Sequence, residues 1–480
     1  MSEETVPSLA AALPLSATGG DGRARQAALA AAAAVEVTPT SLVAYGSAGR
    51  LAVLGATAAV SRVVERLMAI DQARVLAVSV FLTDAEAGAL QAIQTACPDT
   101  RIVHAAINRV EGHLGAFSLF ASVDGEPHQV APSILTANQG FDLVLDLNPG
   151  ALVEHPVAPP GYLWLAAEAL DEERSQALLA QLPELVGEFH KPRYFRLDTG
   201  ICAHARRGLV GCSACLQVCP TGAIASIDKR IEVDPYLCQG GGSCVSVCPS
   251  GAISYAYPPP ADLLARIRVM LDAYGRPGGG APILLVHDAE VGQAWLLEHG
   301  GSLPEHVLPL LVEEIGATGP DIWLSALAYG AASVLLLDHG GVPAPVRDAL
   351  CSQLRIAAAL LDGLGRDGER LALLRLEDLK TDRTTLTSAF DSDRTRTPDW
   401  PPAKHAPQTA KRERLRLALD HLARGAPLQP AEIALPEDAS FGSVEVEQQG
   451  CTLCMACVAV CPASAILAGG ERPELRFIEQ

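Results

Sequence analysis

The residues of this chain that could do chemistry are its cysteines. Eleven of the 13 cysteines fall within two short segments, residues 202–248 and residues 451–461. They recur at C-x2-C and C-x3-C spacing, and the last cysteine of each run is followed by proline. Thiolates spaced in this way can bind a metal ion or an iron–sulfur cluster from one loop. Structural disulfides rarely have this spacing, so we expect metal binding in a reducing compartment.

The first segment contains an internal repeat. The stretches "CSACLQVCPTGAI" and "CQGGGSCVSVCPSGAI" both place Gly-Ala-Ile one residue after a Cys-Pro pair. On these motifs, residues 200–255 resemble the bacterial two-cluster ferredoxin domain. The resemblance implies that each loop binds one face of an iron–sulfur cube, while the cysteine before proline reaches the neighbouring cube. We expect that cysteine to begin a helix, with proline at the first helical position.

The resemblance implies two sets of ligands in this segment. The first set is Cys202, Cys212, Cys215 and Cys248. The second set is Cys219, Cys238 and Cys244. Gly241 stands where the family has the remaining cysteine of the second set, and residues 203–211 form an insertion within the first. Three thiolates fit a [3Fe–4S] cluster, which we favour, or a [4Fe–4S] cluster with one open iron.

Other interpretations of this segment stay open. Four-cysteine zinc sites also use C-x2-C, although they require neither the duplication nor the Cys-Pro pairs. His204, inside the insertion, is a potential ligand but is expected to be a solvated loop histidine. Arg206 and Arg207 are expected to be solvated in the same loop, with partner binding as the alternative.

The second segment, "CTLCMACVAVCPASAI", is a complete half of a two-cluster ferredoxin. The resemblance implies that Cys451, Cys454 and Cys457 bind a third cluster, and that Cys461 serves a fourth cluster whose other ligands are missing. We expect strands on either side of this half, within "GSVEVEQQGC" and "PELRFIEQ".

Such halves normally come in pairs, so we expect the natural chain to continue beyond residue 480. Alternatively, the missing ligand of the third cluster comes from Cys97, Cys351 or a second chain. Both of these cysteines are expected to be buried or structural, Cys97 at a helix end and Cys351 on a helix.

Bulk composition excludes several function classes. The formal net charge of −19 argues against non-specific nucleic-acid binding, which needs a basic surface. The N-terminus lacks a basic region before an apolar run, so it does not resemble a signal peptide. No apolar run is long enough to span a membrane. These features predict a cytoplasmic protein with no membrane span.

The pattern of apolar residues predicts a multidomain α/β and α+β chain. It comprises two α/β domains, a ferredoxin-like two-cluster domain between them and a C-terminal half-ferredoxin. The expected segments are a leader (1–40), an α/β domain (41–190), a two-cluster domain (191–257), a second α/β domain (280–385), a linker (386–412) and a helix with an incomplete ferredoxin domain (413–480).

The two α/β domains carry weaker signals. Gly55 ends a predicted strand before a helix, which is the geometry of a phosphate site, but no G-x-G-x-x-G motif accompanies it. Residues 282–340 resemble the delta subunit of methyl-viologen-reducing hydrogenases, in "PILLVHD" and "DIWLSALAYGAASVLLLD". That family usually carries cysteines here and this segment has none, so the resemblance implies a docking role.

These observations predict an iron–sulfur electron-transfer protein. It would pass single electrons between a partner oxidoreductase and a carrier. The resemblance to multi-cluster ferredoxin-like proteins implies a partner of the formate dehydrogenase or hydrogenase type. One alternative is a catalytic oxidoreductase subunit that uses a flavin or an open-site cluster. Another is an iron–sulfur redox sensor or assembly factor.

Overall fold

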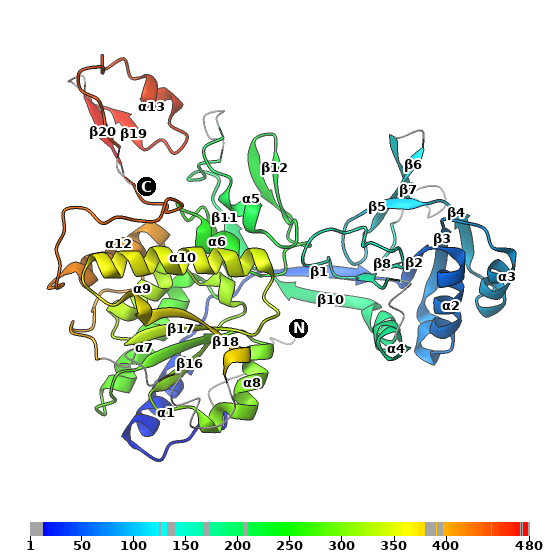
Figure 1. The fold of residues 1–480 in the computed structure, drawn as a ribbon, viewed down its shortest axis with the longest axis horizontal. Coiled ribbons are helices and arrows are strands. Elements are labelled where there is room, and N and C mark those ends of the chain that lie inside the picture. The colour runs from blue at the N-terminus through cyan, green and yellow to red at the C-terminus, as the bar shows by residue number, and fades with distance from the viewer. Residues whose placement is uncertain are drawn as a thin grey trace.

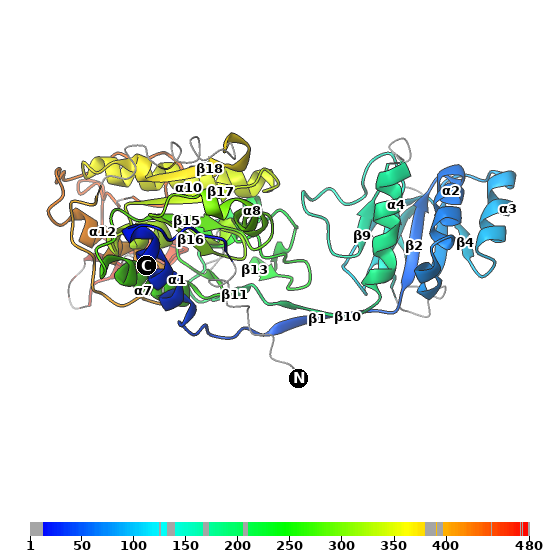
Figure 2. The same cartoon turned by 90° about the horizontal axis from the view of Figure 1, so that it is seen from below.

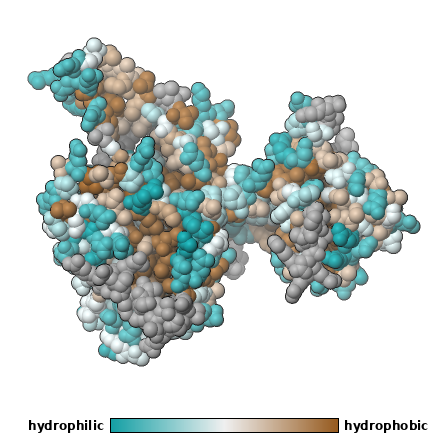
Figure 3. Space-filling model, viewed as in Figure 1, coloured by the Kyte–Doolittle hydropathy of each residue, from teal (hydrophilic) through white to brown (hydrophobic). Residues whose placement is uncertain are grey.

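The computed structural model describes residues 13–123, 126–131, 140–166, 172–204, 210–379, 390, 397–442, 444–470, 472 and 474–478. It has the predicted fold class, with two parallel sheets and a small cysteine-rich unit between them (Figure 1). The space-filling view shows a larger and a smaller lobe joined by a narrow waist, with the C-terminal residues projecting from the larger lobe (Figure 3).

The smaller lobe is built on a five-stranded parallel sheet in the order β4-β3-β2-β8-β9. Its strands are β2 (Arg50–Gly55), β3 (Ala77–Leu82), β4 (Arg101–His104), β8 (Leu143–Asp146) and β9 (Tyr162–Trp164). The accompanying helices are α2 (Thr57–Met68), η2 (Asp71–Val75), α3 (Ala87–Ala96), α4 (Glu172–Gln181) and η5 (Leu182–Leu185). A separate antiparallel sheet contains β5 (Ile107–Glu111), β6 (Ser118–Val123) and β7 (Glu126–Ala131).

A two-stranded ribbon joins the smaller lobe to the rest of the molecule. Strand β1 (Leu42–Ser47) runs antiparallel to β10 (Gly187–Pro192) and does not enter the neighbouring sheet (Figure 2). The sequence predicts one helix over residues 171–189, and the C-terminal part of this prediction is wrong. Helix α4 stops at Gln181, and the chain is already a strand at Gly187.

The larger lobe is built on a four-stranded parallel sheet in the order β16-β15-β17-β18, as the alternating pattern predicts. Its strands are β15 (Ile283–His287), β16 (Val307–Leu311), β17 (Ser333–Asp338) and β18 (Leu371–Arg375). The longer helices of this part are α7 (Pro260–Gly275), α8 (Val291–His299), α9 (Pro320–Ala328) and α10 (Ala344–Gly363). The short ones are η6 (Gly300–Ser302), η7 (Ile315–Ala317), η8 (Gly368–Arg370) and η9 (Leu376–Asp378).

Segments from both ends of the chain complete the core of the larger lobe. Helix α1 (Gly20–Ala33) packs on α7, and α12 (Lys411–Ala423) packs on α9. The proline-rich stretch before α12, expected to be a plain linker, is also packed. Trp400 is buried and donates its indole N–H to the carbonyl of Leu327.

The cysteine-rich unit consists of short elements. They are β11 (Phe195–Leu197), α5 (Ala214–Val218), β12 (Ile224–Ile227), β13 (Arg230–Val233), α6 (Ser243–Val247) and β14 (Ile253–Tyr255). Strand β11 pairs with β14, and β12 pairs with β13. The expectation that the Cys-Pro pairs begin helices is wrong. Cys219 and Cys248 end α5 and α6, and proline follows because it cannot continue a helix.

The C-terminal unit repeats half of this arrangement. Helix α13 (Ala456–Val460) ends at Cys461, and β19 (Ile466–Ala468) pairs with β20 (Leu475–Phe477). The strand expected within "PELRFIEQ" is therefore present. The strand expected within "GSVEVEQQGC" is not, since residues 444–450 form no strand. None of the helices in the described ranges is long and apolar enough to cross a membrane.

Candidate metal centres

The first predicted ligand set comes together in the structure. The thiols of Cys202, Cys212 and Cys248 all lie close enough to Cys215 to interact with it electrostatically. Cys212 and Cys215 lie at the start of α5, while Cys248 is supplied by the end of α6. Burial raises the pKa of the Cys215 thiol to about 12. Metal binding requires the thiolate form, so iron would displace a proton here.

The second predicted set also comes together, beside the first. Cys244 interacts electrostatically with Cys238 and Cys219, and more weakly with Cys215 and Cys248. Burial raises the pKa of the Cys244 thiol well above its ordinary value. Each short helix thus carries cysteines of both sets, with Cys219 at the end of α5 lying near Cys238.

The loop that lacks the expected cysteine is tightly packed. Tyr255 donates its hydroxyl hydrogen to the carbonyl of Gly240, and Gly242 has a left-handed backbone with a φ of 74°. A Cβ added to Gly242 would lie 2.3 Å from the Cα of Ala317 in η7, so only glycine fits. At Gly241, an added Cβ would lie 3.7 Å from Pro220 Cγ, which is ordinary van der Waals contact. The absence of a cysteine at 241 is therefore not imposed by lack of space.

His204 differs from its prediction as a solvated loop histidine. It is 4% exposed, and its two ring nitrogens lie 2.6 Å from the carbonyl oxygen of Cys212 and 2.7 Å from Ser226 Oγ. His204 therefore ties the insertion to β12 and fixes the backbone of a predicted ligand. Arg206 and Arg207 lie outside the described residues.

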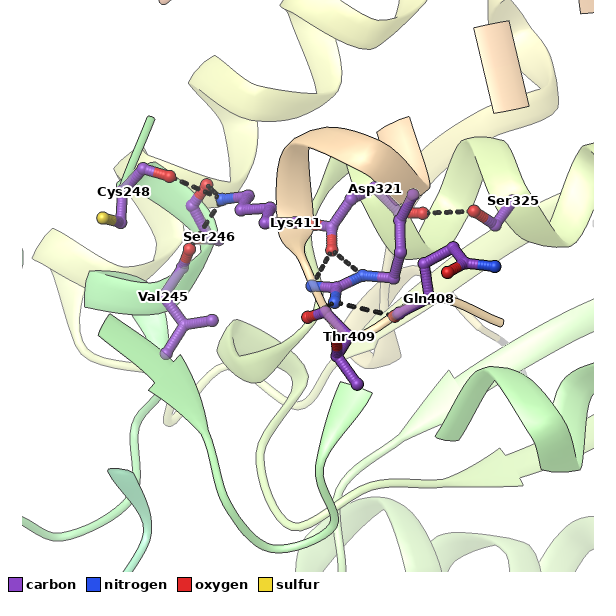
Figure 4. A network of polar contacts seen from close by, with 9 residues as sticks. Val245, Ser246, Cys248, Asp321, Ser325, Gln408, Thr409 and Lys411 are labelled. Carbon is purple, nitrogen blue, oxygen red and sulfur yellow. Dashed lines mark hydrogen bonds and ion pairs between the residues drawn. The ribbon is translucent and has the colours of Figure 1, made fainter. Parts of the chain in front are cut away.

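Two lysines from outside the cysteine-rich unit bind the backbone of predicted ligands, and the sequence analysis missed both. Lys411, at the start of α12, donates through Nζ to the carbonyls of Val245, Ser246 and Cys248 at 2.7, 2.7 and 3.0 Å (Figure 4). These are carbonyls of the last turn of α6, which have no partner within that helix.

Lys191 has the equivalent role beside the second set. From β10, its Nζ donates to the carbonyls of Tyr236 and Cys238 at 2.9 and 2.7 Å. Burial lowers the pKa of Lys191 to about 8, while the nearby Cys238 and Asp234 act in the opposite direction. Each set of thiols thus has one ammonium group directly behind it.

The C-terminal cysteines are more exposed. Cys454 is exposed and Cys451, Cys457 and Cys461 are half-buried. The backbone N–H of Ala465 donates to Cys461 Sγ at 3.4 Å. Although partial burial acts to raise it, the pKa of Cys461 is lowered by amides of residues 463–466.

The C-terminal unit approaches the first set of thiols through small residues next to the cysteines. A Cβ added to Gly211, next to Cys212, would lie 2.4 Å from Pro462 Cγ, next to Cys461. The lone cysteines lie elsewhere in the fold. Cys97 packs against the core of the smaller lobe. Cys351 is exposed on α10, which corrects the expectation that it is buried.

The weak phosphate-site signal at Gly55 has a different explanation in the structure. A carboxylate oxygen of Asp84 accepts hydrogen bonds from the backbone N–H and the hydroxyl of Thr57, at 2.6 and 2.7 Å. Asp84 therefore takes the anion position at the start of α2, where it would repel a phosphate. Gly55 has a positive φ, and an added Cβ would lie 3.1 Å from Leu147 Cβ.

The donor chemistry of the two cysteine segments fits an iron–sulfur cluster. Among the described residues, no three His, Cys, Asp or Glu side chains are gathered to hold a single metal ion. A cube of four irons and four sulfides is larger than one ion and takes more widely separated thiolates.

Comparison with known proteins identifies the same two segments. The family described as "4Fe-4S dicluster domain" matches residues 210–252. The family described as "4Fe-4S binding domain" matches residues 451–465. A comparison with curated proteins found no match to this chain. The two cysteine segments are therefore iron–sulfur modules that bind [4Fe–4S] clusters.

Proposed function

We propose that this chain passes single electrons between a partner oxidoreductase and an electron carrier. The observation that carries the proposal is the pair of adjacent thiol sets, which share α5 and α6. Neighbouring iron–sulfur clusters exchange electrons one at a time, and their chemistry belongs to the iron. The protein supplies ligands, buried surroundings and hydrogen bonds. We propose a redox enzyme of the hydrogenase or formate dehydrogenase type as the partner, as the resemblance to multi-cluster ferredoxin-like proteins implies.

The two sets hold clusters of different composition in this proposal. Cys202, Cys212, Cys215 and Cys248 supply four thiolates, which is the number a [4Fe–4S] cluster takes. The second set supplies three, because position 241 is glycine. We assign a [3Fe–4S] cluster to it. The same reasoning gives Cys451, Cys454 and Cys457 to a third cluster, with Cys461 directed to a fourth.

One observation favours electron transfer over catalysis by this chain. Asp84 takes the place of a phosphate at the start of α2, which weakens the case for a flavin in the smaller lobe.

Electron paramagnetic resonance of the anaerobically purified protein tests the proposal. We expect a [3Fe–4S] signal in the oxidised protein and [4Fe–4S] signals after reduction with dithionite. Metal analysis of the same sample should find iron and sulfide, and zinc in their place would contradict the proposal. Loss of both signals in fully iron-loaded protein would also contradict it.

Position 241 gives a sharper test, because a side chain fits there. Gly241→Cys should supply the fourth thiolate, so the oxidised [3Fe–4S] signal should disappear and a further [4Fe–4S] signal should appear on reduction. Gly241→Ala adds the same Cβ without a thiol and should keep the [3Fe–4S] signal. If the two variants give the same spectra, Gly241 is not at a ligand position.

A further inference from the structure

A cavity of 780 Å³ opens beside the first set of thiols, between the cysteine-rich unit and the start of α12. Such a volume is within the range of ligand sites, about 300–1,000 Å³. Two of its walls adjoin predicted ligands. Ile201, next to Cys202, lines one wall, and residues 250–254, just after Cys248, line another. The cavity is therefore a place where another molecule can approach the first cluster closely.

The lining of this cavity is basic, although the whole chain has a formal charge of −19. Its charged residues are Arg196, Asp198, Lys411, Arg412, Glu413, Arg414 and Arg416. Five of them are cations and two are anions. A positive local charge in an acidic protein favours an anionic occupant.

The arginines at the rim are available for such an occupant. Arg196 and Arg416 are exposed, and neither forms an ion pair with any residue that the structure describes. The deeper Arg414 is 4% exposed and donates to the carboxylate of Asp321 at 2.7 and 2.9 Å. Neither rim cation is therefore neutralised by an ion pair within the described residues, although Asp198 and Glu413 line the same cavity. The wall behind them is held by the ion pair of Arg414 with Asp321.

Screening by salt sets the distance over which the charge of the cavity lining acts on an approaching molecule. At physiological ionic strength the Debye length is about 8 Å, so the distant acidic surface acts weakly on a molecule at the rim. The nearby arginines act strongly, and bidentate contacts of arginine with carboxylates add specificity. Ile201, which is 39% exposed, offers an apolar contact at the same place.

From these observations we propose that the cavity is the docking site of an acidic electron-carrier protein, which exchanges electrons with the first cluster there. The proposal rests on the proposed electron-transfer function and names the partner. Carboxylates of the carrier contact Arg196 and Arg416. One electron moves from the reduced carrier to the oxidised cluster, and the carrier is oxidised by one electron. No covalent bond forms or breaks.

Stopped-flow mixing with a reduced flavodoxin, an acidic carrier, tests this proposal on the iron-loaded full chain. The double variant R196E/R416E should lower the second-order rate of cluster reduction at least tenfold at physiological salt. The difference from wild type should shrink as salt rises. R196K/R416K, which keeps the charges, should retain most of the rate. R62E/R101E, on exposed positions of α2 and β4, makes the same charge change far from the cavity and should leave the rate unchanged.

Two outcomes distinguish failure of the docking proposal from failure of the proposed electron-transfer function. If dithionite does not reduce the clusters of the wild-type protein, the electron-transfer function itself is wrong. A second outcome is that dithionite reduces the clusters normally in every variant, and that R196E/R416E accepts electrons from flavodoxin as fast as R62E/R101E does. In that case the proposed docking site is wrong and the proposed function stands. Normal iron content and dithionite reduction in R196E/R416E exclude misfolding as the cause of a lower rate.

Discussion

Lys411 is a single residue that links the C-terminal helix to the first cluster. Its ammonium group is held by three carbonyls at the end of α6, one of them the carbonyl of Cys248 (Figure 4). Burial lowers the pKa of Lys411, while the charges of Asp321 and Cys248 act in the opposite direction. The three carbonyls that accept from Nζ favour the ammonium form, whose positive charge attracts the cluster more strongly once the cluster is reduced.

We predict that Lys411→Met lowers the midpoint potential of the first cluster. Without the cation, the reduced cluster loses the electrostatic attraction that stabilises its extra negative charge. A tenfold decrease in the equilibrium constant for reduction corresponds to a fall of about 59 mV in the midpoint potential of a one-electron couple. Redox titration followed by electron paramagnetic resonance measures the shift. Lys411→Arg keeps the charge and should stay near the wild-type potential. An equal shift in both variants would indicate a loss of packing and contradict the electrostatic role.

At the scale of elements, α1 is attached to the larger lobe by polar contacts as well as by its apolar packing on α7. The carboxylate of Glu305 accepts hydrogen bonds from the backbone N–H groups of Thr18, Gly19 and Gly22 at 2.8 to 3.0 Å. Arg25, which is fully buried, donates to three backbone carbonyls, including Pro304 and Val307. These contacts tie the first turn of α1 to the segment that leads into β16.

We predict that this attachment depends on pH through Glu305. Backbone hydrogen bonds, first of all from Gly19, lower the pKa of Glu305 to about 2. Because the folded pKa lies below the unfolded value, the carboxylate stabilises the attachment above about pH 4.5. This contribution is lost as pH falls through about 2. Glu305→Gln should therefore increase hydrogen exchange in α1 at pH 7, and the difference from wild type should narrow towards pH 3.

The matched control for this prediction is Glu298→Gln. Glu298 is an exposed carboxylate on α8, and within the described part of the chain its one ion pair is a 3.8 Å contact with His299. We expect its removal to leave exchange in α1 unchanged at both pH values. If Glu298→Gln and Glu305→Gln loosen α1 equally, the effect comes from net charge and not from the hydrogen bonds.

Helices and strands were predictable from the sequence where the local pattern of apolar residues alone determines them. The buried strands and amphipathic helices of both parallel sheets follow from apolar periodicity, and the cysteine spacing gives both iron–sulfur segments. The pairing of β1 with β10 was not predictable, because paired residues lie far apart in the chain, as Leu42 and Pro192 do at a separation of 150 residues. The packed stretch around Trp400 also escaped prediction, since its proline-rich composition resembles that of a linker.

The site was predictable to the same extent. The spacing of the cysteines identifies both iron–sulfur segments. The assignment of Gly241 to a ligand position stays a prediction. Lys191 and Lys411 have no local signal, because their partners are backbone carbonyls brought together only by the fold. His204 was misjudged for the same reason, since its burial depends on β12, which follows it in the chain.

At the scale of the whole molecule, the two lobes and the C-terminal unit all meet at the cysteine-rich unit. Val157 of the smaller lobe donates its N–H to the carbonyl of Pro220 at 3.0 Å. Ala317 of the larger lobe is part of the same buried cluster as Ile224 and Val245. The C-terminal unit contacts Gly211 through Pro462. The cysteine-rich unit therefore contacts three separate parts of the protein.

The last of these contacts predicts magnetic coupling between the third cluster and the first. Pro462 contacts Gly211, which precedes Cys212 of the first set. Cys461, which precedes Pro462, donates its backbone N–H to the carbonyl of Cys457 at 3.1 Å, so a ligand of the third cluster lies one helical turn from this contact. In the fully reduced protein, electron spins on neighbouring clusters broaden each other's resonance signals. We expect C451S/C454S/C457S to remove the third cluster and narrow the signal of the first. Cys351→Ser, the same change at an exposed cysteine outside the modules, should not. An unchanged signal in the triple variant, with its third cluster gone by iron analysis, would mean that the C-terminal unit lies apart and exchanges electrons elsewhere.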